Sequence, residues 1–357
     1  FEIKFSLLRS FSVLARIQPR GKNRRITVIS QFLPQAISDR RCMIAALFLS
    51  LGMTAAANAS QTADTVTAQE FVDLQEGDSP HAGYRRAHAK GVCVTGEFRA
   101  NGNLSDIVTT PLFAPGVTPF TGRYSIAGGN PYASDLSSPV RSLALNFALS
   151  STNQWRIAMN TPPVMAVTNP HDFYQQIVAI KKGPEAVKAF FKDHPESKDF
   201  MTWRASYSPA GSFSGETYHS LNAFYLHDKQ GNKQAVRWKM VPASAAPFDE
   251  TEGPDALQER LAQQLEAAPV VYDWVFTLAG ADDDENNPAV KWPDSREQRV
   301  AGQIVITDWQ RQLEGNCHSL NFDPLVLPDG ISATEDPILR ARSAAYAESY
   351  RRRAREA

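Results

Sequence analysis

The sequence is poor in cysteine and has no cysteine pattern that is typical of a metal site. Its 357 residues include three cysteines, and no two of them form a C-x-x-C pair. Cys42 lies in an N-terminal segment that we expect to be removed, and two cysteines are too few for a disulfide framework. Cys93 and Cys317 lie in strand-like segments, where a bridge is permitted but a buried thiol is the more common state. The scattered histidines lack the spacing of zinc ligands.

Positive charge is scarce outside the N-terminal segment. Residues 1–42 carry nine Lys and Arg side chains against Glu2 and Asp39. Residues 60–357 carry 28 basic and 36 acidic side chains, a formal net charge of −8. A surface of this charge repels phosphate backbones, so we expect no nucleic-acid partner.

The most apolar segment is shorter than a membrane-spanning helix, which needs about 20 apolar residues. Ile44–Ala57 follows Arg40–Arg41 and ends in the small residues Ala57–Ala59, which is the order of a secretory signal peptide. We interpret residues 1–59 as leader and signal peptide and expect cleavage before Ser60. The mature protein is then periplasmic, without a stable membrane anchor.

Residues 60–357 contain no internal repeat and no low-complexity linker, so we predict one domain. Their β-type segments fall into two groups separated by residues 171–198, which read as two helices broken at Gly183–Pro184. A further helix is expected from Pro254. The strand candidates are 91–100, 123–129, 142–149, 155–159, 164–167, 201–208, 216–228, 235–242, 269–279 and 299–309. We predict an α+β fold with about eight antiparallel strands in a closed barrel and helices packed outside.

Four short motifs follow one another along the chain. Residues 85–91 read R-R-A-H-A-K-G, and residues 121–125 read T-G-R-Y-S. Residues 159–164 read M-N-T-P-P-V, and residues 169–173 read N-P-H-D-F. Each motif alone has an ordinary interpretation as a strand, turn or core segment, but their order and spacing together are hard to obtain by chance.

The C-terminal segment is expected to be a helix. Asp336 is suited to the N-cap, and Pro337 to the first helical position. Arg342 and Tyr346 are four residues apart and so share a helix face, and Arg353 follows seven residues after Tyr346. An alternative interpretation of the terminal arginines is a solvated basic helix end stabilised by the helix dipole.

Together, these motifs resemble the catalase family, and in particular the minimal catalase-related peroxidases, over about residues 66–357. The resemblance implies haem b as cofactor, ligated through iron by Tyr346 as its phenolate, a form that Arg342 favours. Only eleven residues follow Tyr346, and we expect the extra C-terminal domain of large catalases to be absent.

The resemblance also assigns a role to each further site residue. His88 is the distal acid–base group, Asn160 binds the peroxide, and Ser125 hydrogen-bonds the imidazole. Phe173 stacks on the haem. The residues that we expect to bind the haem carboxylates are Arg85, Arg123 and Arg353.

The implied function is reduction of hydrogen peroxide, or an organic peroxide, by an organic reductant, with weak catalase activity. Two alternatives remain open. One is a haem isomerase that acts on lipid hydroperoxides, and the other is a non-enzymatic periplasmic haem-binding protein. The expected assembly is a monomer or a small homo-oligomer.

Overall fold

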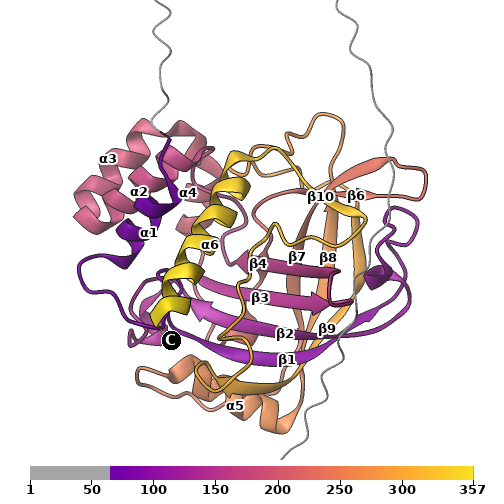
Figure 1. Ribbon diagram of the computed structural model, residues 1–357, viewed down its shortest axis with the longest axis horizontal. Helices are drawn as coiled ribbons and strands as arrows, with labels where there is room; N and C mark the ends of the chain where they lie inside the picture. The colour runs from indigo at the N-terminus through magenta and orange to yellow at the C-terminus, as the bar shows by residue number, and fades with distance from the viewer. Residues whose placement is uncertain (1–64, 357) are drawn as a thin grey trace, which may run out of the picture. The chain divides into compact units, whose positions relative to one another are not determined.

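Eight antiparallel strands close into a barrel in the computed structural model, which describes residues 65–356 (Figure 1). Around the ring the order is β7–β5–β4–β3–β2–β1–β9–β8, and pairing of β8 with β7 closes it. Strands β6 and β10 extend the sheet beyond β7. The bounds are β1 Gly91–Ala100, β2 Gly116–Ile126, β3 Arg141–Ala148, β4 Gln154–Asn160, β5 Tyr218–His219, β6 Phe224–His227, β7 Lys233–Ser244, β8 Val270–Leu278, β9 Gln298–Arg311 and β10 Ile331–Ala333. The predicted eight-stranded barrel is confirmed.

The barrel interior is filled with aromatic side chains. Trp155 and Trp274 are fully buried, with ring centroids 5.3 Å apart, and Phe147 stacks on Trp274 at 5.6 Å. Burial of such large side chains is the main stabilising contribution to the fold. A filled interior also means that a ligand site has to lie outside the barrel wall.

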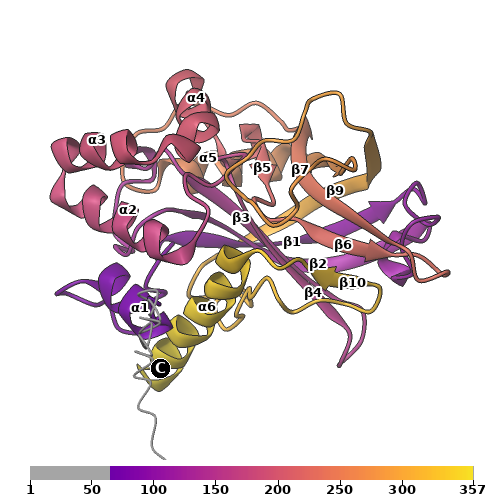
Figure 2. The ribbon, with the colours of Figure 1, turned by 90° about the horizontal axis from the view of Figure 1, so that it is seen from above.

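Six helices pack outside the barrel, within the described residues. Their bounds are α1 Ala68–Glu76, α2 Pro170–Lys182, α3 Pro184–Asp193, α4 Lys198–Ser206, α5 Ala256–Ala267 and α6 Pro337–Glu356. Short 3₁₀ helices cover Pro111–Phe113, Asp135–Ser137, Pro195–Ser197 and Phe213–Gly215. Figure 2 shows α2, α3 and α4 grouped on one side, with α1 beside α6. No helix of the described part of the chain is both long and apolar enough to cross a bilayer.

Several sequence-based expectations for the helices are confirmed. Gly183 separates α2 from α3 with a φ of 104°, a conformation that glycine adopts without strain. Asp336 caps α6, because its Oδ1 accepts from the backbone N–H of Ile338 at 2.8 Å. The predicted helix after Pro254 is α5.

Two strand predictions are wrong. Residues 201–208 are not a strand, because residues 201–206 belong to α4, and Tyr207 at its C-cap stacks on Trp203 at 4.5 Å. That contact between residues four apart requires helical geometry. Residues 164–167 have no regular secondary structure and bury their side chains between the barrel and the helices.

Cys93 on β1 and Cys317 form a disulfide, with their Cα atoms 5.3 Å apart. The sequence leaves open whether these two cysteines are bridged, and the structure shows that they are bridged and buried. The bridge fixes the segment that follows β9 to the first strand. Residues 1–59, the predicted leader and signal peptide, lie outside the described residues.

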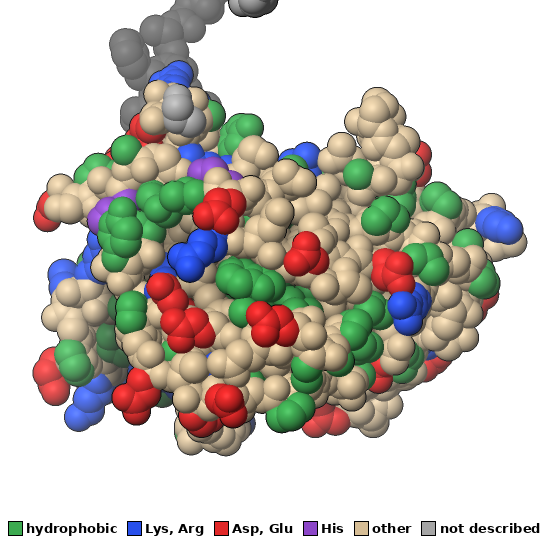
Figure 3. Space-filling view, turned by 90° about the horizontal axis from the view of Figure 1, so that it is seen from below, with side chains coloured by type: hydrophobic (Ala, Val, Ile, Leu, Met, Phe, Trp, Pro, Cys, Tyr) green, Lys and Arg blue, Asp and Glu red, His purple; other side chains and the backbone are tan. Residues whose placement is uncertain are grey.

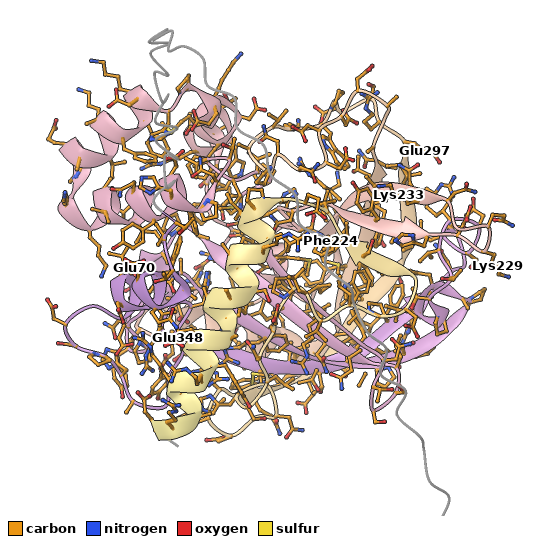
Figure 4. All side chains as sticks on the ribbon, turned by 45° about the horizontal axis from the view of Figure 1, so that its top comes forward. Glu70, Phe224, Lys229, Lys233, Glu297 and Glu348 are labelled. Atoms are coloured by element: carbon orange, nitrogen blue, oxygen red, sulfur yellow. A yellow bond between two sulfur atoms is a disulfide. The ribbon has the colours of Figure 1, made fainter. Side chains whose placement is uncertain are left out.

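Ion pairs join α1 to α6. Arg352 of α6 contacts Glu76 of α1 at 2.7 Å and Glu348 at 2.8 Å, and Arg86 contacts Glu76 at 3.0 Å. Figure 4 labels Glu70 on α1 and Glu348 on α6, on the same side of the barrel. These ion pairs hold α6 against its neighbours, which matters because α6 carries several site residues.

On the face in Figure 3, acidic side chains are dispersed among apolar and uncharged ones.

Candidate active site

A cavity of about 390 Å³ lies against the outer face of the barrel and is covered by helices. Its wall comes from β2, β3 and β4, and its cover comes from α1, α2, α4 and α6. The sequence-predicted site residues that line it are Arg85, His88, Arg123, Ser125, Asn160, Phe173, Arg342, Tyr346 and Arg353. The fold therefore brings every predicted site residue to one cavity.

Strand alternation explains why the barrel wall is polar on this side. On β2, Arg123 and Ser125 line the cavity while Tyr124 between them is buried in the barrel core. Ala144 on β3 and Ala158 on β4 are direct partners in the sheet. Both line the cavity, and their small side chains protrude little from the sheet.

His88 has an unusual backbone conformation that the neighbouring strand holds in place. Its φ is +52°, a value that costs free energy for a residue with a Cβ. Arg123 donates from Nη2 to the carbonyl oxygen of His88 at 2.8 Å. This approach needs glycine at position 91, since a Cβ there would lie 2.6 Å from the Arg123 guanidinium carbon.

The side chain that meets the His88 imidazole belongs to Ser142 on β3. Ser142 Oγ lies 3.2 Å from His88 Nδ1 and donates a short hydrogen bond to Asn160 Oδ1. Among the described residues, no hydrogen bond joins Ser125 to His88. The structure therefore gives the contact that was predicted for Ser125 to Ser142, which lies directly opposite Ser125 in the sheet.

The electrostatic surroundings keep the His88 ring neutral. Burial lowers the pKa of the imidazole from 6.5 to about 4. The positive charges of three guanidiniums lower the pKa of His88 further, with the largest effect from Arg123, then Arg342, then Arg85. A neutral imidazole at ordinary pH can accept a proton, which a general base must do.

Three arginines meet at one end of the cavity without acidic partners. No ion pair within residues 65–356 involves Arg85, Arg123 or Arg353. Burial, with the neighbouring guanidiniums, holds the pKa of Arg85 well below its usual range and lowers that of Arg123 to about 9. Nη1 of Arg85 and Nη1 of Arg353 are buried without a hydrogen-bond partner. Such uncompensated positive charge is stabilised by an anionic ligand.

The segment after β9 holds these arginines, and the sequence alone did not identify it. Arg85 donates from Nη2 to the carbonyl oxygens of Cys317 at 2.9 Å and Leu320 at 2.8 Å. Arg353 donates to the same Leu320 oxygen at 3.3 Å. Gln312 accepts from Arg123 Nε at 3.1 Å. The disulfide at Cys317 thus anchors the carbonyls that orient the guanidiniums.

Tyr346 lines the cavity from α6 and packs against the disulfide and Phe322. One turn earlier on the helix, Arg342 donates to the carbonyl oxygen of Ala158 at 3.0 Å and makes a short hydrogen bond to Asn222 Oδ1. Asn222 is fully buried and was also missed from the sequence. It precedes β6 and donates from Nδ2 to Asp336, the N-cap of α6, at 2.6 Å, a contact between distant segments that no local pattern reveals.

The side of the cavity under the helical cover is apolar. Phe173 and Ile180 contribute from α2, and Phe200 from α4. Phe71 of α1 packs on Phe173, with ring centroids 5.7 Å apart. Ile180 is 57% exposed, so this apolar side reaches the surface.

The whole-chain comparisons agree with the geometry. A family model described as Catalase matches residues 60–272. A catalase-related peroxidase of Synechococcus elongatus is 35% identical over 331 residues, which cover 87% of this chain and 95% of that protein. The chain belongs to the catalase family. The resemblance to catalase-related peroxidases is confirmed by a second relative of that name, from Mycolicibacterium paratuberculosis, at 27% identity over 81% of the chain and 95% of that protein.

Solved structures of catalases share the fold. Catalase A from Saccharomyces cerevisiae superimposes with a TM-score of 0.67 at 18% identity, covering 76% of this chain and 62% of that catalase. A fungal catalase gives the same TM-score and identity and is covered to 60% of its length. At this identity the similarity concerns the fold.

The cavity also fits the cofactor that the sequence predicts for a catalase-like chain. Haem is flat and carries two carboxylates. The cavity is lined by the small side chains of Ala144 and Ala158 and by unpaired donors on Arg85 and Arg353. Tyr346 supplies a phenol of the kind that ligates iron. The residues present therefore match the group in charge and ligand type.

Proposed function

We propose that this catalase-family chain is a haem peroxidase that reduces hydrogen peroxide, or an organic peroxide, with electrons from an organic donor. The observation that carries the proposal is one cavity holding the His88 imidazole, the Tyr346 phenol and a cluster of buried arginines. The relatives named catalase-related peroxidases support the same activity. Weak catalase activity is part of the proposal.

The cofactor is haem b, and the chain's own residues account for its binding. Arg85, Arg123 and Arg353 bind the two carboxylates through charge-assisted hydrogen bonds. Tyr346 ligates the iron as its phenolate, and Phe173 contacts the ring. When bound, the iron supplies the redox chemistry that breaks the O–O bond.

His88 and Asn160 handle the peroxide. The neutral His88 imidazole takes a proton from the entering peroxide and returns it to the departing oxygen, which leaves as water. Asn160 donates a hydrogen bond from its amide nitrogen to the peroxide, which stabilises charge that develops on oxygen. The apolar side chains that α2 and α4 contribute to the cavity lower the local dielectric constant, which strengthens both interactions.

The protein is proposed to act in the periplasm. The disulfide between Cys93 and Cys317 supports this location, since disulfides persist in oxidising compartments. The signal-like segment at residues 1–59 supports the same conclusion. Mass spectrometry of the protein recovered from periplasmic and cytoplasmic fractions would test it, with cleavage before Ser60 as the expected result.

Substrate specificity decides between the peroxidase and the alternatives. The haem-loaded protein should oxidise two equivalents of a one-electron phenolic donor for each hydrogen peroxide consumed. A lipid hydroperoxide isomerase would convert fatty-acid hydroperoxide without a donor and ignore hydrogen peroxide. A haem carrier would bind haem and turn over neither substrate, and either result would overturn the proposal.

A further inference from the structure

Ser142 occupies the middle of a row of three side chains that face the cavity. It pairs with Ser125 of β2 on one side and with Asn160 of β4 on the other. Its own side chain is largely buried, at 9% exposure. Of the two hydroxyls in this row, only that of Ser142 contacts both the Asn160 amide and the His88 ring.

The contacts of this hydroxyl determine where the protons lie. Ser142 donates its single proton to Asn160 Oδ1. Its oxygen can then only accept at the 3.2 Å contact with His88, so Nδ1 must carry the imidazole proton. The other ring nitrogen, Nε2, is left with a free lone pair, and the Asn160 amide keeps its N–H groups for another acceptor.

We propose that Ser142 is a positioning residue that fixes the His88 tautomer and the Asn160 amide orientation together. The inference rests on the proposed function, because both groups act on the peroxide. It makes one hydroxyl responsible for presenting a proton acceptor, His88 Nε2, and a hydrogen-bond donor, Asn160 Nδ2, to the same substrate. In the reverse arrangement, the flipped amide donates to Ser142 and Ser142 donates to His88 Nδ1. The substrate would then meet an N–H donor at His88 Nε2 and an acceptor oxygen at Asn160, which is the opposite of what the reaction needs.

The role of Ser142 is separable from the fold of the His88 segment. The His88 backbone is held by Arg123, whose Nη2 contacts the carbonyl oxygens of His88 at 2.8 Å and Ala89 at 3.3 Å. The N–H of Ala89 bonds to the carbonyl oxygen of Gly128 at 2.9 Å. Loss of the Ser142 hydroxyl therefore frees the imidazole ring and the amide without releasing the backbone.

The test compares Ser142→Ala with Ser142→Thr, which keeps a hydroxyl on the strand. Nitrogen NMR of the haem-free protein, labelled at histidine, reports the His88 tautomer directly. We expect the Nδ1–H form in the wild type and in Ser142→Thr, and a mixture of tautomers in Ser142→Ala. In the haem-loaded protein, kcat should fall about 10- to 100-fold in Ser142→Ala with haem uptake unchanged and with activity largely restored in Ser142→Thr. Ser206→Ala, at an exposed position on α4, is the neutral control.

Different results overturn different claims. Wild-type His88 in the Nε2–H form, or an unchanged tautomer in Ser142→Ala, would overturn the role of Ser142 whatever the activity. An undiminished kcat in Ser142→Ala, or a larger loss in Ser125→Ala, would also overturn it. If the wild-type protein binds haem and is inactive, the proposed function fails, whereas the NMR measurement still decides the positioning role.

Discussion

Arg123 holds the backbone of His88, with its Nη2 atom 2.8 Å from the His88 carbonyl oxygen. The same arginine belongs to the cluster of buried guanidiniums that faces the cavity. One side chain of β2 thus connects the arginine-lined end of the cavity to the residue that we propose as the proton acceptor. Gly91 has to lack a side chain for Arg123 to fit.

Replacing His88 by alanine should remove the proton relay and leave haem binding intact. General acid–base groups typically contribute about 10²- to 10⁴-fold to a rate, so we expect a loss of that size in kcat. Stopped-flow measurement of peroxide reduction per bound haem gives the number. A His88→Ala protein with the wild-type rate would remove His88 from the mechanism.

The pH dependence of the reaction follows from the pKa of His88, which burial lowers to about 4. The ring stays neutral above that value, so the rate per bound haem should be flat near neutral pH and fall as the pH drops through about 4. The free energy of unfolding should also fall as the pH drops. Because the unfolded ring titrates near 6.5, the unfolded state binds more protons between pH 6.5 and 4, and acidification through this window destabilises the wild type. His88→Ala should lose the acid limb of the rate profile but only part of the acid destabilisation, because burial also lowers the pKa of His219 and of His318 to about 4. An acid destabilisation as large in His88→Ala as in the wild type would contradict this explanation for His88.

Replacing Tyr346 by phenylalanine should remove the iron ligand while keeping the packing against the disulfide. Loss of a residue that only hydrogen-bonds to a metal-ligating side chain typically lowers metal affinity by about 10- to 100-fold. Loss of the ligand itself should cost more, so we expect haem affinity to fall by about 100-fold or more. Tyr350→Phe is a matched control, because Tyr350 lines the same cavity from the next turn of α6. A loss of haem in Tyr350→Phe but not in Tyr346→Phe would show that the wrong phenol was assigned.

Removing the disulfide should destabilise the protein. The Cys93–Cys317 bridge closes a loop of 224 residues, for which the chain-entropy argument gives at most about 5 kcal/mol at 25 °C. Denaturant unfolding of a Cys93→Ala, Cys317→Ala double variant measures the change in the free energy of unfolding. Wild-type protein under reducing conditions should show the same loss, and unchanged stability in both would contradict a stabilising role.

Local patterns predicted those parts of the fold that local physics determines. The bounds of β1 agree with the predicted segment 91–100, because a run of β-formers ended by polar residues is a local signal. The N-cap at Asp336 and the break at Gly183 are local as well. Residues 201–208 were misread because alternating apolar and polar residues mimic a strand, although the aromatic residues at 200, 203 and 207 have the spacing of a helix.

The missed site residues depend on contacts between distant segments. Ser142 meets His88 because of the register between β2, β3 and β4, which the sequence does not display. Asn222 orients Arg342 across 120 residues of chain. The nine predicted residues were found through motifs of a known family, and the structure adds the residues that hold them in position.

Titration of the purified protein with haem, followed by absorption spectroscopy, tests directly whether this chain is a haem peroxidase. We expect saturation at one haem per chain, and a spectral change on addition of hydrogen peroxide that an organic donor reverses. A protein that takes up no haem, or whose bound haem does not respond to peroxide, would contradict it.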